Sequence, residues 1–318
     1  MTTFADGVYQ YGGMPVGVGQ FAAQKVFSTN NGIQNKGRAW FVDPGYGGNG
    51  NGRSPNTAFS TMARAFAAIA SGDVIYVIGK VVEQLVTPVQ IFDVTVVGCG
   101  NRPRHADATP TGGNWAAAQW APPASGGVAA QATVRVLQQG WRFMNLLFTA
   151  VDANAAGIEI VRNAGAGNAE RDSSHASILG CRFAGAGIGI RGGVAGLFTE
   201  IPFNVEVGWS QFDGMTLGMS AAIACNQWYI HDNVFMTNTS QITMALQNSV
   251  IARNIIGPFT AAANSGGIDL DAGAGLNQVT LNTLSGTYSI AGGYRVGAAD
   301  DNWYGNAAST GFTTADPG

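Results

Sequence analysis

A short pattern of large apolar residues repeats along the second half of the chain. Each copy has an apolar residue, a small or polar residue three positions later, and a large apolar residue two positions after that. Counted from Phe148, which ends a looser first copy, the closing residues lie 21 to 35 positions apart. Drifting periods of this length predict a solenoid with insertions, in which each copy supplies one coil. The clear copies are Ile178, Cys181 and Phe183; Val207, Ser210 and Phe212; Ile230, Asn233 and Phe235; Ile251, Asn254 and Ile256; and Val279, Asn282 and Leu284.

A second short strand is predicted in each copy, in most copies after a glycine-rich turn. Two short strands per repeat, with no amphipathic helix between repeats, suit coils whose equivalent strands stack in parallel. Alternation along a strand puts Ile158 and Ile160 inside and Glu159 outside, and it likewise puts Ile188 and Ile190 inside. The predicted second strands are Gly157–Ile160, Gly187–Ile190, Gly214–Leu217, Ile242–Leu246 and Gly267–Leu270.

Asparagine occupies the same position in three successive copies. Asn233, Asn254 and Asn282 each stand three residues after the first apolar residue of the pattern. Stacked coils lie about 4.8 Å apart, so aligned amides can hydrogen bond to one another along a turn. The three asparagines are therefore predicted to form a structural ladder.

The segment before the repeats is predicted to cover the first end of the solenoid, which would otherwise offer an unpaired edge. Residues 55 to 71 have apolar residues at helical spacing after Ser54-Pro55, which predicts a capping helix. Val74–Ile78 and Val94–Val97 are predicted as strands of the first coils. Residues 102–131, which include Trp115 and Trp120, do not show the repeat pattern and are predicted to form a long loop over the helix flank.

Composition excludes several functional classes. Hydrophobic residues make up 46% of the chain and charged residues 11%, with 46 glycines and a net charge of −3. The 16 basic residues form no stripe, so we expect no nucleic-acid partner. No segment is long and apolar enough to span a membrane, and no leader pattern opens the chain, so we expect a soluble protein made in the cytoplasm. Cys99, Cys181 and Cys225 are expected to be buried free thiols.

The opening and closing motifs resemble those of right-handed parallel β-helix proteins of the pectate-lyase-like superfold. The resemblance implies an all-β protein built as a single right-handed parallel β-helix, with an N-terminal capping helix and an extended N-terminal arm. The expected segments are an arm at 1–38, a first strand and capping helix at 39–80, the β-helix at 81–305 and a tail at 306–318. The motifs are Phe41–Asp43, Gly52–Pro55, Ala58-Phe59, Thr61-Met62, Ala65, Gly72–Val77 and Asp301–Gly305.

Two short segments look like those of virion proteins of tailed phages. They are Tyr11–Pro15, near the start, and Gly140–Phe143, which opens a coil. This resemblance implies a place in a bacteriophage particle.

The sequence contains no convincing catalytic motif. Trp228–Asp232 is similar to the Trp-Ile-Asp-His motif of pectate lyases, but its last two residues are reversed and it is expected to be a solvent-facing turn. Asp269 and Asp271 alternate on one strand and could form an acid pair, although solvated edge residues are the preferred interpretation. His175 is expected in a polar loop, and 43–52 in a turn rather than a calcium loop. No catalytic residue, metal ligand or cofactor site is therefore predicted.

The sequence leads us to expect a non-enzymatic structural protein of a bacteriophage virion, most consistent with a capsid decoration or cement protein that forms a homotrimer. The arm is expected to dock on the major capsid protein or another virion protein, because a segment of this composition can order itself on a partner. The alternative is a tailspike or receptor-binding protein that binds or cleaves cell-surface polysaccharide. A cellular polysaccharide lyase is a third possibility. The candidate docking residues are Phe4, Tyr9, Tyr11, Met14, Phe21 and Phe27.

Overall fold

In this computed structural model, part of the chain is described in detail. The described residues are 10–11, 14–15, 37–48, 50–100, 118–124, 131–150, 155–163, 171–193, 202–221, 223–257, 266–270, 275–285, 294–295 and 300–308.

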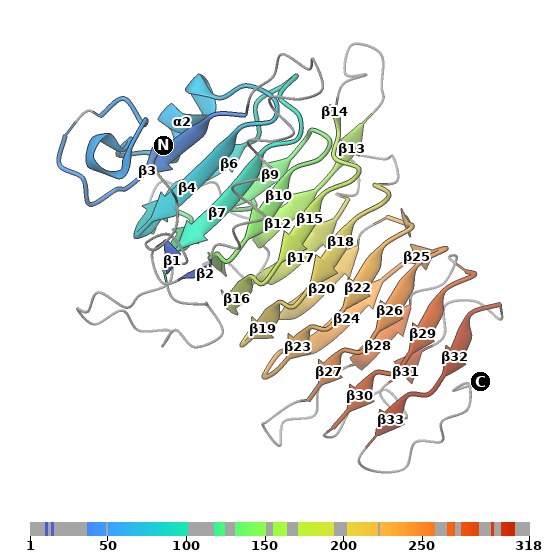
Figure 1. The fold of residues 1–318 in the computed structure, drawn as a ribbon. Helices are drawn as coiled ribbons and strands as arrows, with labels where there is room; N and C mark the ends of the chain where they lie inside the picture. The colour runs from blue at the N-terminus through green and yellow to red at the C-terminus, as the bar shows by residue number, and fades with distance from the viewer. Residues whose placement is uncertain are drawn as a thin grey trace.

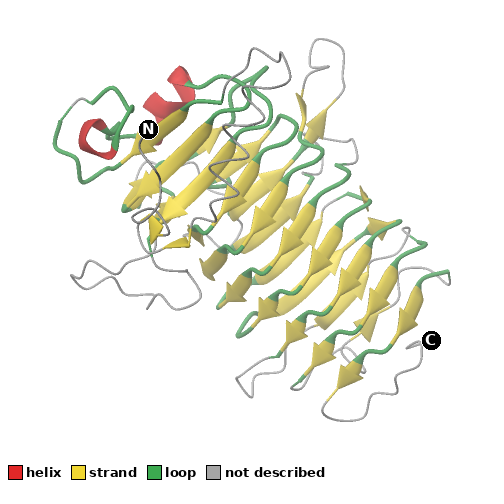
Figure 2. Ribbon diagram, viewed as in Figure 1, coloured by secondary structure: helices red, strands yellow, loops and turns green. Residues whose placement is uncertain are grey.

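Three long parallel β-sheets wind around one apolar core, so the predicted all-β parallel β-helix is confirmed (Figure 1). Strands make up nearly all the regular structure (Figure 2). Each coil contributes one strand to each sheet, and every pairing within these sheets is parallel. We name them sheets I, II and III in the order in which the chain visits them.

Sheet I has ten strands in the described part of the chain. From the strand that contains Phe143 onward, the middle residue of each strand points into the core. In order along the sheet, its strands are β3 (Ala39–Val42), β4 (Val74–Ile78), β7 (Thr95–Cys99), β10 (Arg142–Met144), β15 (Ser177–Leu179), β18 (Glu206–Gly208), β22 (Tyr229–His231), β26 (Val250–Ala252), β29 (Gln278–Thr280) and β32 (Asn302–Tyr304).

Sheet II has nine described strands and carries the aromatic part of the core. Its strands are β5 (Lys80–Val82), β8 (Gln119–Ala121), β11 (Leu147–Ala150), β16 (Arg182–Gly185), β19 (Gln211–Asp213), β23 (Val234–Phe235), β27 (Ile255–Ile256), β30 (Thr283–Leu284) and β33 (Ala307–Ala308).

Sheet III has eight described strands. They are β6 (Leu85–Val86), β9 (Val134–Val136), β12 (Ala156–Ile160), β17 (Ile188–Gly192), β20 (Leu217–Ala221), β24 (Ser240–Met244), β28 (Gly266–Leu270) and β31 (Tyr294–Arg295). Three two-stranded pairs lie outside the sheets: β1 (Gln10–Tyr11) with β2 (Met14–Pro15), β13 (Arg162–Asn163) with β14 (Arg171–Asp172), and β21 (Cys225–Asn226) with β25 (Leu246–Gln247).

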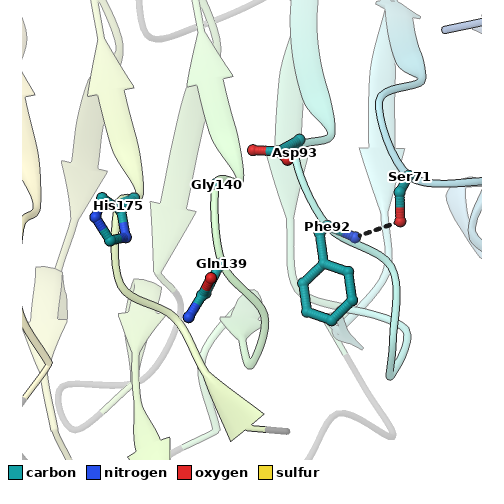
Figure 3. Close-up of a pocket in the computed structure, with 6 residues that line it drawn as sticks. All are labelled: Ser71, Phe92, Asp93, Gln139, Gly140 and His175. Atoms are coloured by element: carbon teal, nitrogen blue, oxygen red, sulfur yellow. Dashed lines mark hydrogen bonds between the residues drawn. The ribbon is translucent and has the colours of Figure 1, made fainter. Parts of the chain in front are cut away.

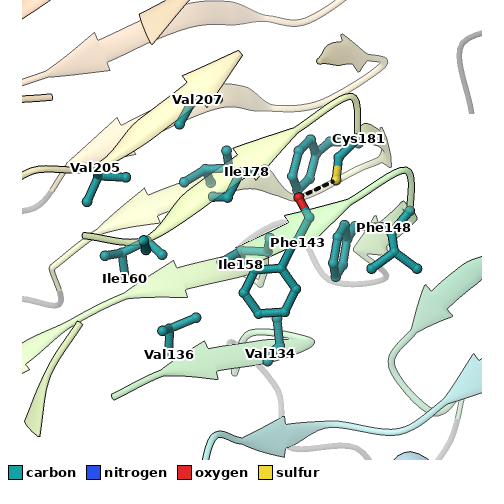
Figure 4. Close-up of a cluster of buried hydrophobic side chains, with 14 of the residues drawn as sticks. Val134, Val136, Phe143, Phe148, Ile158, Ile160, Ile178, Cys181, Val205 and Val207 are labelled. Atoms are coloured by element: carbon teal, nitrogen blue, oxygen red, sulfur yellow. Dashed lines mark hydrogen bonds between the residues drawn. The ribbon is translucent and has the colours of Figure 1, made fainter. Parts of the chain in front are cut away.

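Stacked phenylalanines fill the core beneath sheet II. The rings of Phe183 and Phe212 lie 4.8 Å apart at 7°, and those of Phe212 and Phe235 lie 4.6 Å apart at 5°. Each ring needs space from the neighbouring strand of sheet III: a Cβ on Gly189 would lie 2.6 Å from Cδ1 of Phe212. Glycine is therefore required beside the stack. Figure 4 shows the earlier coils of this core, where Phe143, Phe148 and Ile158 converge.

The N-terminal cap is shorter than the helix predicted over residues 55 to 71. A 3-10 helix, η1 (Pro55–Thr57), is separated from α2 (Met62–Ala68) by extended backbone. The interruption has a physical cause: Phe59 donates its N–H to Phe41 and pairs with Val42, which forces it out of helical geometry. The α2 helix nevertheless buries Phe66 edge-on against the rings of Trp120 and Trp141, and so covers the first coils.

Three further expectations need correction. Part of the predicted loop 102–131 is strand β8, whose Trp120 is fully buried, because it pairs with β5 and β11. The strand predicted at Gly214–Leu217 is instead β20, which places Met219 beside Ile190. Strand β33 lies in the segment expected as a tail, because it pairs with β30 and extends sheet II. In the described residues, no helix is long and apolar enough to cross a membrane.

Candidate functional site

The outer face of sheet III holds an ion-pair column centred on Glu159. Its two carboxylate oxygens accept from Arg135 Nε at 2.6 Å and from Arg191 at 2.8 Å, and these arginines lie on the strands on either side. Glu159 points away from the core as predicted, but it is fully buried rather than solvated, because the two arginines cover it. A carboxylate with both oxygens committed in this way is a structural group and not a free acid or base.

Asp269 lies in the same outward column, at some distance from Glu159. The column runs from Glu159 through Arg191, Ser220 and Thr243 to Asp269, which is four strand steps. Four steps amount to about 19 Å, whereas glycosidase acid pairs are roughly 5 to 9.5 Å apart. These two carboxylates therefore cannot act as a pair. The expectation that Asp269 is solvated is wrong, because its side chain is buried; Asp271 lies outside the described residues.

A second cluster is built around His231 on the outer face of sheet I. His231 is almost fully buried, which corrects the expected solvent-facing turn. Its ring stacks on Tyr229 at 4.0 Å and meets Trp209 edge-on at 4.7 Å. The neighbouring strand makes room for the ring at Gly208, where a Cβ would lie 2.6 Å from the imidazole.

Carboxylates occupy both nitrogens of the His231 ring. Asp232 lies 2.7 Å from Nδ1, and Glu206 lies 3.2 Å from Nε2. Arg253 donates to both oxygens of Asp232 at 2.9 and 2.7 Å, and also to the hydroxyl of Tyr229. These hydrogen bonds from Arg253, assisted by His231, hold the pKa of Asp232 below its usual range. The cluster is thus a closed network, and neither ring nitrogen is open to a substrate.

A hollow of about 440 Å³ lies at the turn that precedes the strands of sheet I (Figure 3). Ser71, Asp93 and His175 line it, which are residue types of a hydrolytic triad. Backbone pairing places Ser71 and His175 three coils apart, about 14 Å. Moreover, the Ser71 hydroxyl accepts from Phe92 N at 2.9 Å. The hollow therefore does not assemble a triad.

Two other candidate sites, around His175 and in the loop 43–52, are also explained by structural contacts. His175 is 3.3 Å from the Asn204 amide, while Ser173 and Ser174 are buried and Ser173 donates to the Val161 carbonyl. Asp43 accepts from the Gly45 N–H, as a turn aspartate does. Among the described residues, no three His, Cys, Asp or Glu side chains gather closely enough to hold a metal ion.

The structure brings the three predicted ladder asparagines together. Oδ1 of Asn254 accepts from both N and Nδ2 of Asn233 at 3.0 Å, and Oδ1 of Asn282 does the same for Asn254 at 2.9 Å. All three are buried. The column also includes Ser210, which holds the same position in the preceding copy of the pattern, and Asn306 after Asn282; neither was predicted as a ladder member.

A second ladder at the opposite end of the same strands was missed. Trp228 N donates to Ser249, Ser249 N donates to Asn277, and Asn277 donates through N and Nδ2 to Asp301 Oδ1. Asp301, the first residue of the closing motif, is buried as the last member. A sequence signal existed: Ser249, Asn277 and Asp301 each stand five residues before an asparagine of the first ladder.

The candidate docking arm is described only in part. Tyr11 and Met14 are directly opposite each other in the antiparallel pair β1–β2. Phe4, Tyr9, Phe21 and Phe27 lie outside the described residues. The boundary expected after residue 38 falls slightly late, because Arg38 N donates to Asp73 and its carbonyl accepts from Val74, so Arg38 already belongs to the first coil.

Comparisons with known proteins support the fold class. No protein-family model matches the chain, and no curated protein matches it. Among solved structures, YbhC of Escherichia coli is 12% identical over 85% of this chain and 77% of its own, with a TM-score of 0.50. A pectin methylesterase from Aspergillus niger is 14% identical over 85% of both chains, with a TM-score of 0.44. The pectate lyase Pel9A is 13% identical over 83% of this chain and 79% of its own, with a TM-score of 0.36.

The chain is a parallel β-helix protein, as its three long parallel sheets show. At such identities the likeness concerns the fold alone, since one fold hosts many activities.

Proposed function

We propose that this protein is a non-enzymatic structural component of a bacteriophage particle, a decoration protein whose coil is displayed on the capsid. The phage context rests on the resemblance of Tyr11–Pro15 and Gly140–Phe143 to segments of tailed-phage virion proteins. Within a virion, a short capped solenoid adds a rigid outer body without needing an active site.

The non-enzymatic part of the proposal rests on the structural role of the carboxylates. In the described part of the chain, six acidic side chains are committed to holding coils or the cap together. Glu83, for example, accepts from Met62 N and Ala63 N at the start of α2, where a helix has unsatisfied donors. The six are Asp73, Glu83, Glu159, Asp213, Asp232 and Asp301.

The attachment test alters the arm within the full chain. Replacing Phe4, Tyr9, Tyr11, Phe21 and Phe27 together by serine should leave melting of the coil unchanged but abolish binding to phage particles that lack the protein. The reason is that aromatic side chains buried on a partner contribute much of the binding energy of an interface. Val89→Ser, which alters an exposed residue of the coil, is the control and should bind normally. Full occupancy by the arm variant would contradict the proposal.

The enzymatic alternative is tested separately. The purified protein should not cleave pectins or the capsular and O-antigen polysaccharides of the host. If the purified protein cleaves any of these polysaccharides, it is a tailspike-type enzyme and the proposal is wrong.

A further inference from the structure

We propose that an exposed ridge at the corner between sheets I and II is the surface through which copies of this chain associate. The ridge consists of Trp209, Asp232, Arg253 and Leu281, with Ile255 and Tyr304 beside them. The sequence leads us to expect a homotrimer but indicates no surface for it, and this inference does not depend on the docking arm.

The backbone stacks the ridge residues in one column. Each coil turns this corner through one residue in the left-handed region, with φ of 52° at Trp209, 53° at Asp232, 55° at Arg253 and 58° at Leu281. The N–H of each donates to the carbonyl just before the next column member: Trp209 to His231, Asp232 to Ala252 and Arg253 to Thr280. The four side chains therefore follow one another at about 4.8 Å per coil.

The left-handed backbone conformation is unfavourable for Trp209, Arg253 and Leu281. Left-handed backbone favours glycine, asparagine and aspartate, and the same corner is turned elsewhere by Asn145 and Gly180. Packing within the coil uses only part of these side chains: Trp209 meets His231 edge-on, yet about half its surface, and slightly more of Leu281, is exposed. Bulky residues held in strained backbone and displayed outward indicate a role in contact with another molecule.

The composition of the ridge fits a protein partner better than a sugar. Trp, Tyr and Arg are the residues enriched at the energetic centres of protein interfaces. Ile255 and Leu281, each 55% exposed, add aliphatic surface that an interface core can bury. A glycan would instead require free polar groups beside the aromatic ring, whereas the two polar residues of the ridge, Asp232 and Arg253, bond to each other.

Charge and periodicity favour a second copy of the same chain as that partner. The two charges of the ridge form an ion pair at 2.7 Å, so the surface is close to neutral and does not repel itself. The side chains of the ridge repeat once per coil, so their spacing equals that of the same ridge on a second copy. Two copies aligned along their axes can therefore place side chains in register over several coils.

The test compares glycine variants of the full chain by sedimentation velocity over a concentration series. Glycine suits the left-handed backbone, so Leu281→Gly and Trp209→Gly should keep the coil folded while they remove the contact side chain. Leu276→Gly is the matched control, because Leu276 is equally exposed and left-handed, with φ of 60°, but lies at the other end of its sheet I strand. Circular dichroism verifies folding of every variant.

The wild-type chain and Leu276→Gly should sediment as the same oligomer, and each ridge variant should weaken association by at least about 30-fold. A wild-type chain that stays monomeric throughout would overturn the proposal, including the case in which Trp209 proves necessary for binding a polysaccharide. Association that survives Leu281→Gly, or that Leu276→Gly disrupts equally, would also overturn it.

Discussion

Asn254 receives two hydrogen bonds from Asn233 through one oxygen, from the backbone N–H and from the side-chain amide, each at 3.0 Å. Its own amide nitrogen donates to the Ile230 carbonyl and to Oδ1 of Asn282. A single buried side chain thus satisfies polar groups on both neighbouring coils. Such a network is stable only while each member remains, because the unpaired groups would have no access to water.

Asn254→Leu should therefore lower the free energy of unfolding by roughly 1 to 3 kcal/mol, because the buried backbone N–H of Asn233 loses its acceptor and Oδ1 of Asn282 keeps only one of its two donors. Chemical denaturation followed by circular dichroism measures the change. Asn302→Leu makes the same substitution at an exposed position and should change stability by less than about 0.5 kcal/mol. Equal losses in the two variants would refute the ladder as a source of stability.

The sequence predicted the parts of the fold that repeat regularly. The pattern at Ile230, Asn233 and Phe235 was sufficient to predict one coil. Its three positions are the centre of a sheet I strand, a ladder position and the core beneath sheet II. Strand β20 was misplaced because Met215 and Leu217 mimic the expected alternation. The residue that pairs with Ile190 is Met219, which follows Phe212 by seven residues just as Ile190 follows Phe183. Strand β8 was missed because the residues around it do not show the repeat pattern.

Gly189→Ala should destabilise the coil by about 2 to 3 kcal/mol, the cost of overpacking a tight core. The added methyl group would lie 2.4 Å from the Gly218 carbonyl oxygen and 2.6 Å from the Phe212 ring. The Phe212 ring cannot yield because Phe183 and Phe235 stack on its two faces. Thermal melting checks this, with Gly47→Ala as the control, since its Cβ would meet no atom within 4 Å. A normal melting temperature for Gly189→Ala would show that the stack is more adaptable than described.

The candidate sites were harder to predict than the fold because their partners come from different coils. Nothing near Glu159 in the sequence indicates that Arg135 and Arg191, 24 and 32 residues away, cover its carboxylate. The same holds for His231, which looks like a turn residue until Gly208 and Trp209 of the preceding coil enclose it. Outward direction was predictable from alternation, whereas burial by neighbouring coils was not.

Glu159→Gln should cost about 3 kcal/mol of stability, because it leaves two guanidinium groups facing each other without the carboxylate between them. Replacing one arginine as well should recover part of the loss. The double variant Glu159→Gln with Arg191→Met is therefore expected to be more stable than Glu159→Gln alone. Denaturant unfolding of the two variants and of Arg191→Met completes a double-mutant cycle. An additive result would mean that the ion pairs contribute little.

The three cysteines make the protein sensitive to alkali. Burial raises the pKa of Cys99 and Cys181 from 9.0 to about 12, and it also raises the pKa of Cys225. In the unfolded chain these thiols ionise near pH 9, whereas the folded chain keeps their protons. The stabilising difference is thus fully present below pH 9 and is lost as pH rises from there toward 12, because the unfolded state then binds fewer protons.

Unfolding free energy should accordingly fall between about pH 9 and about pH 11 by up to roughly 1.4 kcal/mol per pH unit for each thiol. Cys181 lies wholly inside the core, with its thiol toward the Phe143 carbonyl (Figure 4). Cys181→Ala should therefore reduce this slope, although the cavity it leaves lowers stability at every pH. At pH 8 the native thiols should not react with a thiol reagent until denaturant is added. Rapid labelling of the folded protein, or an unchanged slope in Cys181→Ala, would contradict this account of the buried thiols.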